Sequence, residues 1–283
     1  MILDAHVHFW DPARLRYAWL DGLPSLRRAF TPAEYFATVG DRVDRVMFVE
    51  ANCDAAENRD EVAFVERLAA ADERIAAIVA YADMTDPHLG CALDALAQRP
   101  LVRGVRQNIQ GNPAGFCLRP AFIAGVREVG RRGFTFDICV THDQLGDALA
   151  LVQACPDARF VLDHGGKPRI GGAMLESWSV GLSRLAECPN VCCKLSGLLT
   201  EADESHRTRD ALLPFAECIV NCFGVDRLLF GSDWPLVTMA GGFDAWLALV
   251  EELVSACTPS ERERFYGGTA AAVYGVPTWS SGS

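Results

Sequence analysis

The chain has 283 residues, of which 50% are hydrophobic and 22% charged, a balance typical of a globular protein and not of a disordered one. The formal net charge of −11 excludes nucleic acid and anionic membrane surfaces as expected partners, because both attract clustered Lys and Arg. No apolar run reaches the roughly 18 residues of a transmembrane helix, and the N-terminus lacks a signal-peptide pattern. The sequence therefore predicts a cytoplasmic protein.

Short apolar or β-branched segments recur along the chain and alternate with segments of helical periodicity. The predicted strands span residues 2–9, 45–51, 75–81, 103–109, 134–140, 159–164, 191–196 and 228–232. The predicted helices span about 54–72, 86–98, 118–132, 144–154, 173–187, 207–223, 242–256 and 259–272. Eight strands alternating with helices predict an α/β fold, the (β/α)8 TIM barrel.

One domain accounts for this pattern, with the barrel over residues 1–276 and a tail at 277–283. An open doubly wound sheet is the structural alternative. That fold normally carries a Gly-rich phosphate turn after its first strand, and residues 9–13 contain no glycine. The sequence therefore favours the closed barrel.

The longest connection, residues 10–40, is rich in aromatic side chains. In a barrel the first βα loop lies at the catalytic face, so this segment is expected to form a lid or a pocket wall. Trp10 directly follows the first strand and is the candidate for a substrate contact. The alternative is that these aromatic side chains pack together in a local cluster.

His6 and His8 lie on the first predicted strand. Because side chains alternate between the faces of a strand, both point the same way, with Cα atoms roughly 6.5 Å apart. Two imidazoles at that separation can converge on one metal ion or one substrate group. The alternative is a pair of strand histidines that only satisfy each other's hydrogen bonds.

Chemistry in a barrel collects at the C-terminal ends of its strands. Polar residues at the predicted strand ends are His6, His8, Glu50, Asn52, Tyr81, Arg106, Asn108, Asp137, Thr141, His142, Asp163, His164, Lys194, Ser196, Ser232 and Asp233. Within this set His6, His8, His164 and Asp233 are the ligand types of one divalent metal such as zinc. Asp233 is also the candidate general base, and its alternative role is to cap the following element.

Three motifs resemble those of a known family. The first-strand His-x-His, the His-Gly-Gly-Lys-Pro run at 164–168 and the Gly-Ser-Asp-Trp-Pro run at 231–235 resemble the amidohydrolase superfamily, in particular its branch of sugar lactonases. The resemblance implies that His6, His8 and His164 surround the reacting centre and that Asp233 activates water. It also implies a small-molecule substrate, an aldono-1,4- or 1,5-lactone similar to L-fuconolactone, which is hydrolysed to the aldonic acid.

The fourth strand departs from the binuclear members of that superfamily, which place a bridging carboxylated lysine or glutamate there. This chain has Arg106, and a guanidinium cannot bridge two cations. One metal ion, such as zinc, or no metal at all is therefore expected.

The remaining candidates are substrate-binding residues. They are Arg106, Lys194, Trp10, Glu50 and Asn108. Arg106 and Lys194 would hold substrate hydroxyls or place positive charge where an oxyanion develops. The alternative for both is a structural salt bridge with Glu50 or Asp137.

Two other functions compete with lactone hydrolysis. A metal-dependent decarboxylase of the same superfamily would bind a carboxylate, for which several arginines at the barrel mouth are expected. A non-catalytic sugar-binding barrel would keep its ligand affinity after Asp233→Asn, whereas a hydrolase would lose turnover. The sequence leaves the identity of the lactone and the oligomeric state open.

Overall fold

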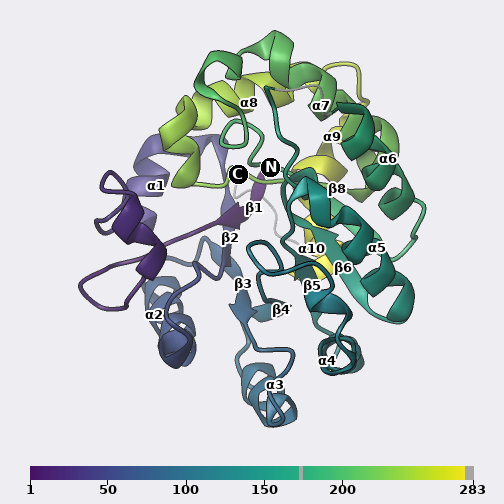
Figure 1. Ribbon diagram of the computed structural model, residues 1–283. Helices are drawn as coiled ribbons and strands as arrows, with labels where there is room; N and C mark the ends of the chain where they lie inside the picture. The colour runs from purple at the N-terminus through teal and green to yellow at the C-terminus, as the bar shows by residue number, and fades with distance from the viewer. Residues whose placement is uncertain (172–174, 278–283) are drawn as a thin grey trace.

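The computed structural model describes residues 1–171 and 175–277. Its parallel sheet has the order β1-β2-β3-β4-β5-β6-β7-β8. The strands are Leu3–Val7 (β1), Arg45–Val49 (β2), Ile75–Tyr81 (β3), Val102–Arg106 (β4), Thr135–Ile138 (β5), Arg159–Leu162 (β6), Val191–Leu195 (β7) and Leu228–Phe230 (β8). The segment after β8 returns to β1, where the His8 N–H donates to the Trp234 carbonyl at 2.8 Å (Figure 1). The predicted TIM barrel is confirmed.

Helices surround the barrel (Figure 1). They are Pro32–Val39 (α1), Asn58–Ala71 (α2), Leu89–Ala97 (α3), Pro120–Arg131 (α4), Leu145–Ala154 (α5), Leu175–Ala186 (α6), Arg209–Phe223 (α7), Gly242–Leu253 (α8), Pro259–Glu263 (α9) and Thr269–Tyr274 (α10). Of these, α1 lies in a segment that the sequence treats as a loop. Its start follows from local chemistry, because the Thr31 hydroxyl accepts from the Glu34 N–H and Pro32 occupies the first turn.

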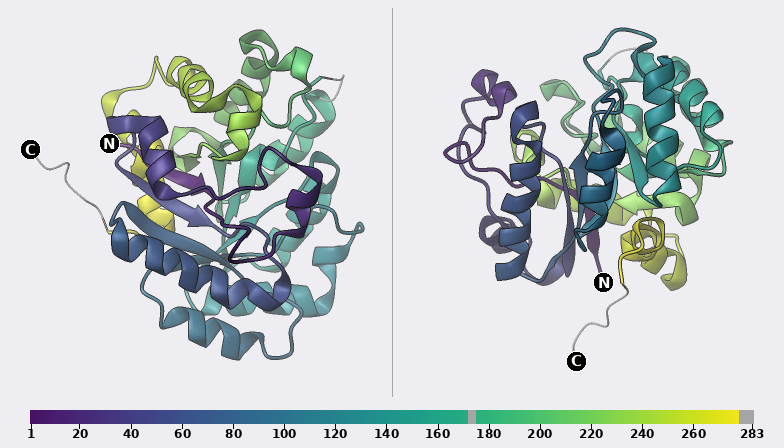
Figure 2. Two further views of the ribbon diagram at one scale, coloured as in Figure 1. Left: turned by 90° about the vertical axis from the view of Figure 1, so that its left-hand side faces the viewer. Right: turned by 90° about the horizontal axis from the view of Figure 1, so that it is seen from below.

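The C-terminal helical segment packs against the end of the barrel where the strands begin. It covers the predicted helix 259–272 and places α10 beside the N-terminus (Figure 2). A small apolar cluster joins strand residues such as Leu3 and Val79 to Tyr274 on α10, and a much larger cluster lies between the barrel and the outer helices. The opposite end of the barrel is therefore the open one. The predicted tail, 277–283, lies outside the described residues except for residue 277.

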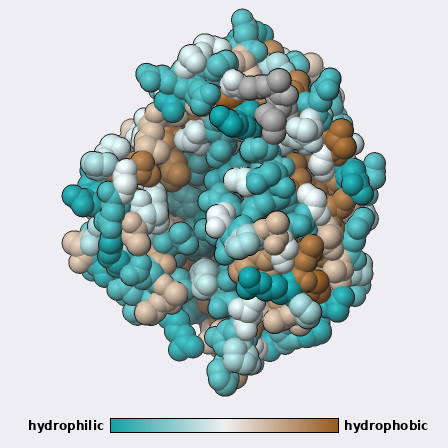
Figure 3. Space-filling model, in the orientation of Figure 1, coloured by the Kyte–Doolittle hydropathy of each residue, from teal (hydrophilic) through white to brown (hydrophobic). Residues whose placement is uncertain are grey.

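The strands mostly end earlier than the sequence pattern predicts. His8 follows β1, Asn108 follows β4, and His164 lies in the turn after β6. These residues thus lie in the loops at the open end of the barrel. Figure 3 shows a hollow on this face, with mainly hydrophilic walls. Within the described ranges, no helix has both the length and the apolar character needed to cross a membrane.

Candidate active site

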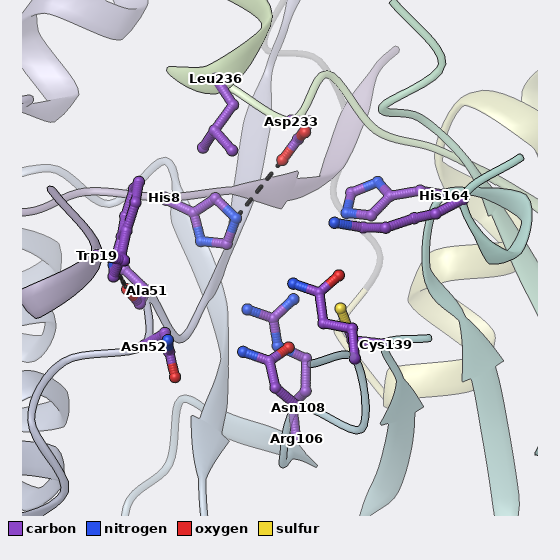
Figure 4. A pocket seen from close by; sticks show the side chains of 12 residues that line it. His8, Trp19, Ala51, Asn52, Arg106, Asn108, Cys139, His164, Asp233 and Leu236 are labelled. Carbon is purple, nitrogen blue, oxygen red and sulfur yellow. Dashed lines mark hydrogen bonds and ion pairs between the residues drawn. The ribbon is translucent and has the colours of Figure 1, made fainter. Parts of the chain in front are cut away.

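His6 on β1, His8 directly after β1 and Asp233 in the segment after β8 meet at the open end of the barrel; Figure 4 shows His8 and Asp233 facing each other. The Nε2 atoms of His6 and His8 lie 3.2 Å apart. Oδ1 of Asp233 lies 3.8 Å from the His6 Nε2 and 3.6 Å from the His8 Nε2. All three side chains are buried. We refer to His6, His8 and Asp233 as the acceptor cluster, because their facing atoms are all hydrogen-bond acceptors.

The partners of the other ring nitrogens fix which nitrogen of each histidine carries a proton. Nδ1 of His8 lies 2.7 Å from the Val49 carbonyl oxygen, which can only accept, so this nitrogen donates. Nδ1 of His6 faces Oδ1 of Asp163 at 3.3 Å, and a carboxylate likewise favours a proton on that nitrogen. In the neutral rings both Nε2 atoms then carry lone pairs. Three acceptor atoms therefore face one another.

Protonation states at neutral pH agree with this assignment. Burial and the positive charge of Lys194 hold the pKa of His6 well below its usual range. Burial lowers the pKa of His164 to about 4. Burial alone would raise the pKa of Asp233, but the neighbouring His164, His8 and His6 outweigh burial and lower that pKa. The imidazoles of His6 and His164 are therefore neutral, and the Asp233 carboxylate is ionised.

A divalent cation fits the acceptor cluster. A tetrahedral zinc ion, about 2.0–2.1 Å from each ligand atom, separates those atoms by roughly 3.4 Å. The observed separations run from 3.2 to 3.8 Å. Oδ1 of Asp233 is buried without a hydrogen-bond donor, which a cation would supply. A second group that could hold a metal, His6, Asp163 and His164, shares His6 with the first.

A pocket opens next to the acceptor cluster. Its described lining residues are His8, Trp19, Ala51, Asn52, Arg106, Asn108, Gln110, Cys139, His164, Lys167, Asp233 and Leu236. Figure 4 shows Asp233, His8 and His164 toward one end of it and Arg106 and Asn108 toward the other. The pocket thus joins groups able to activate water to groups able to bind a polar substrate.

Backbone strain is concentrated at this pocket. Within the described ranges, the non-glycine residues with positive φ are Asn52, His164, Lys167 and Asp233, at 55°, 54°, 48° and 60°. All four line the pocket. Each such residue costs on the order of 1 kcal/mol and persists only where the surrounding structure holds it. This concentration of strain makes the pocket the candidate functional site.

His164 is held by contacts on both sides. Its Nδ1 lies 2.8 Å from the Ser196 hydroxyl, which leaves Nε2 on the other edge of the ring, and its ring centroid lies 4.4 Å from that of His6. A Cβ atom at Gly197 would come within 2.6 Å of the His164 Nδ1, so only glycine fits beside the ring. His164, in the turn after β6, is thus fixed next to the acceptor cluster.

Comparison with known proteins decides the family. An amidohydrolase family model matches residues 3–276. The chain belongs to the amidohydrolase family. The L-fucono-1,5-lactonase of Burkholderia multivorans is 33% identical to it over 293 residues, which cover 97% of this chain and 96% of the relative. The L-rhamnono-gamma-lactonase of Scheffersomyces stipitis is 22% identical over 200 residues, which cover 62% of this chain and 60% of the relative.

A solved structure agrees with this assignment. The crystal structure of an amidohydrolase from B. multivorans with bound zinc superimposes with a TM-score of 0.89 at 32% identity. The match covers 98% of this chain and 100% of the other. The family resemblance carried by the three sequence motifs is therefore confirmed.

In this amidohydrolase Arg106 is the last residue of β4, and the carboxylates of Glu50 and Asp163 compensate its charge. Its Nε donates to Glu50 at 2.6 Å, and its two terminal nitrogens donate to the Glu50 carbonyl at 2.6 Å and to Asp163 at 3.0 Å. Glu50 also accepts from the Asn52 N–H at 2.7 Å. Arg106 lines the pocket, whereas Glu50, predicted to bind substrate, is not among the described lining residues. Glu50 instead positions Arg106 and Asn52.

Lys194 lies in the barrel interior and does not belong to the described lining residues. Its ammonium is fully buried, 2.6 Å from Asp137 and 3.0 Å from Asp163. The Tyr274 hydroxyl donates to Asp137 at 2.7 Å. Asp137, Asp163, Lys194 and Tyr274 form what we call the core ion network. The structure thus places Lys194 in the salt bridge that was the alternative to a substrate contact.

Trp19 lines the pocket, whereas Trp10, predicted to contact substrate, is not among the described lining residues. Trp10 is buried, its indole N–H donates to the Leu26 carbonyl at 3.1 Å, and it packs edge-on against Trp19 with ring centroids 5.2 Å apart. Trp19 lines the pocket and donates to the Ala51 carbonyl at 2.8 Å. The segment 10–40 thus contributes a pocket wall through Trp19, with Trp10 as its support.

Several lining residues escaped the sequence analysis. Asn108 was predicted and lines the pocket, whereas Gln110, Cys139, Lys167 and Leu236 had no assigned role. Lys167 lies inside the His-Gly-Gly-Lys-Pro run, which was the available signal. For Gln110 the signal was its place just beyond the predicted strand 103–109, and for Cys139 its place near the end of the predicted strand 134–140.

Proposed function

We propose that this amidohydrolase hydrolyses a sugar lactone, an aldono-1,4- or 1,5-lactone similar to L-fuconolactone, to the open aldonic acid. The observation that carries the proposal is the acceptor cluster, a buried carboxylate that faces the Nε2 atoms of two imidazoles at the edge of a polar pocket. The 33% identity to an L-fucono-1,5-lactonase over nearly the whole chain supports it.

Asp233 is the proposed general base. Its buried carboxylate is ionised and lies at the pocket wall, so it can take a proton from the attacking water and return it to the ring oxygen that leaves. His6, His8 and Asp233, with His164 beside them, would hold one divalent metal such as zinc, which when bound supplies a Lewis acid that lowers the pKa of water. Val49 and Asp163 keep the two strand-one histidines in the tautomer that presents Nε2 to the cluster.

The pocket chemistry suits a polyhydroxylated ligand. Asn52, Asn108 and Gln110 line it, and each amide can donate and accept, which matches hydroxyl groups. Oδ1 of Asn108 is buried without a partner in the protein, so a ligand hydroxyl would satisfy it. A lactone also needs less activation than an amide, because its leaving group is an alcohol.

The test is a pH-indicator assay over a panel of aldonolactones, run on chelator-treated protein before and after zinc is restored. We expect turnover of at least one lactone, loss of most activity after verified metal removal, and recovery with zinc. Thermal unfolding offers an independent readout, since zinc at 100-fold its Kd should add about 2.7 kcal/mol of stability.

The outcomes separate the alternatives. No turnover of any lactone contradicts the proposal. Full activity in verified metal-free protein removes the metal from the mechanism and leaves Asp233 as the base. Adding aromatic and β-keto acids to the panel tests decarboxylation, and retained lactone binding without turnover in the zinc-loaded protein identifies a binding protein.

A further inference from the structure

Lysine is nearly absent from this chain. Of its 26 Lys and Arg residues, only Lys167 and Lys194 are lysines. The described exposed ion pairs, such as those of Arg28, Arg209 and Arg264, all use arginine. Lysine carries a compact ammonium with three donors, whereas arginine carries a planar guanidinium, so the two residues serve different contacts. Lys167 lines the pocket, and Lys194 lies in the barrel interior.

The two lysines differ in what surrounds their charge. Lys194 is fully buried between two carboxylates in the core ion network. Lys167 lines the pocket, its side chain is 17% exposed, and its ion-pair partner Glu201 lies 3.5 Å away. That separation exceeds a normal hydrogen bond, so the ammonium keeps donors for a ligand. Lys167 is therefore reachable from the pocket, and Lys194 is not.

Arg106 is the other Lys or Arg side chain among the described lining residues, and it carries two carboxylate partners at 3.0 Å or less. Its charge is thus compensated within the protein. Lys167 has the less compensated charge, and it shares the pocket wall with Asp233 and His164. A substrate oxygen that becomes negative beside Asp233 would find its counter-charge in Lys167.

The backbone around Lys167 forms a strained turn that fixes the position of this residue. Residues 164–167 all have positive φ, at 54°, 58°, 73° and 48°, and form one left-handed turn closed by the Lys167 N–H donating to the His164 carbonyl at 3.0 Å. Gly165 has a φ of +58°, and a Cβ there would come within 2.4 Å of the end of the Ile219 side chain, so glycine is favoured inside the turn. One strained turn thus delivers both His164 and Lys167 to the pocket.

We propose that Lys167 is a further catalytic residue, whose ammonium donates a hydrogen bond to the carbonyl oxygen of the lactone. When water attacks, the new C–O bond forms and the carbonyl electron pair moves onto that oxygen, next to the ammonium. The pair returns as the ring C–O bond breaks, and Asp233 passes the water proton to the ring oxygen. Lys167 keeps its proton throughout. The inference rests on the proposed lactone hydrolysis.

Kinetics of two variants test this role. Lys167→Met should lower kcat for the lactone about 10²- to 10³-fold, the effect of removing one oxyanion donor. Glu201→Gln is the matched control, because it removes the ion-pair partner and leaves the ammonium in place, and it should stay within about threefold of the parent. Equal effects of the two variants, or a Lys167→Met enzyme as fast as the parent, would overturn the inference.

Amine labelling of the unmodified protein gives an answer that does not depend on a variant folding. Reductive methylation with formaldehyde and dimethylamine-borane can modify only the N-terminus and two lysines, and mass spectrometry resolves them. We expect Lys167 to react, Lys194 to resist, and the aldonate product of the active lactone to protect Lys167. An unchanged Lys167 rate at saturating aldonate would count against the inference.

The two hypotheses fail in different ways. A parent protein that hydrolyses no lactone of the panel overturns the proposed function, and with it the role assigned to Lys167. A parent that hydrolyses a lactone while Lys167→Met matches it overturns the role of Lys167 alone.

Discussion

The barrel contains two neighbouring buried polar clusters, which differ in how their charges and hydrogen-bonding atoms are paired. In the core ion network Lys194 meets Asp137 and Asp163, so opposite charges face each other. In the acceptor cluster His6, His8 and Asp233 present lone pairs to one another, and Oδ1 of Asp233 has no donor. The charges of the core ion network are compensated within the protein, whereas acceptors without a donor require a partner from outside the chain.

Asp163 connects the two clusters. One of its oxygens lies 3.3 Å from the His6 Nδ1 and 3.0 Å from Lys194, and the other accepts from Arg106 at 3.0 Å. The paired cluster therefore holds in place the histidine of the unpaired one. Stability and chemistry are separated in space but share this carboxylate.

The largest effect is expected from a substitution in the acceptor cluster. Asp233→Asn removes the proposed base and should lower kcat on the lactone by about 10³- to 10⁴-fold. The fold should persist, because the substitution replaces a buried carboxylate by an amide of the same shape. Steady-state kinetics and thermal unfolding measure the two quantities. A variant with unchanged kcat would remove Asp233 from the mechanism.

A substitution in the core ion network should lower the stability of the fold. Lys194→Met leaves Asp137 and Asp163 facing each other without the ammonium, which should cost about 3–5 kcal/mol in the free energy of unfolding. Urea titration followed by circular dichroism measures it. Arg264→Met is the control, since it removes an exposed pair with Asp226 and should cost no more than about 1 kcal/mol. Equal costs for both variants would refute the distinction.

The smallest effect concerns the pocket wall. Trp19→Phe keeps an aromatic ring but removes the N–H that donates to the Ala51 carbonyl. One such hydrogen bond is worth about 1 kcal/mol, so KM should rise roughly fivefold with kcat little changed. A drop in kcat with constant KM would show that Trp19 serves the chemical step instead. Initial-rate kinetics over a range of lactone concentrations distinguishes the two.

Local patterns in the sequence predicted the barrel because eight strand segments alternate with helical ones, and this alternation admits few parallel topologies. They also predicted that His6, His8, His164 and Asp233 lie at strand ends, where a barrel gathers its chemistry. The helix α1 was missed although Thr31, Pro32 and Glu34 form a legible start, because the aromatic residues around it were interpreted as a loop.

Only the tertiary structure decided which strand-end residues face the pocket. The two-residue period of a strand assigns a side chain to one face of the sheet. It does not show which charged side chains from other strands lie next to it on that face. Lys194 turns to the carboxylates of β5 and the turn after β6, and the left-handed turn at 164–167 carries Lys167 to the pocket wall. Both outcomes depend on contacts between distant segments, which local sequence patterns do not encode.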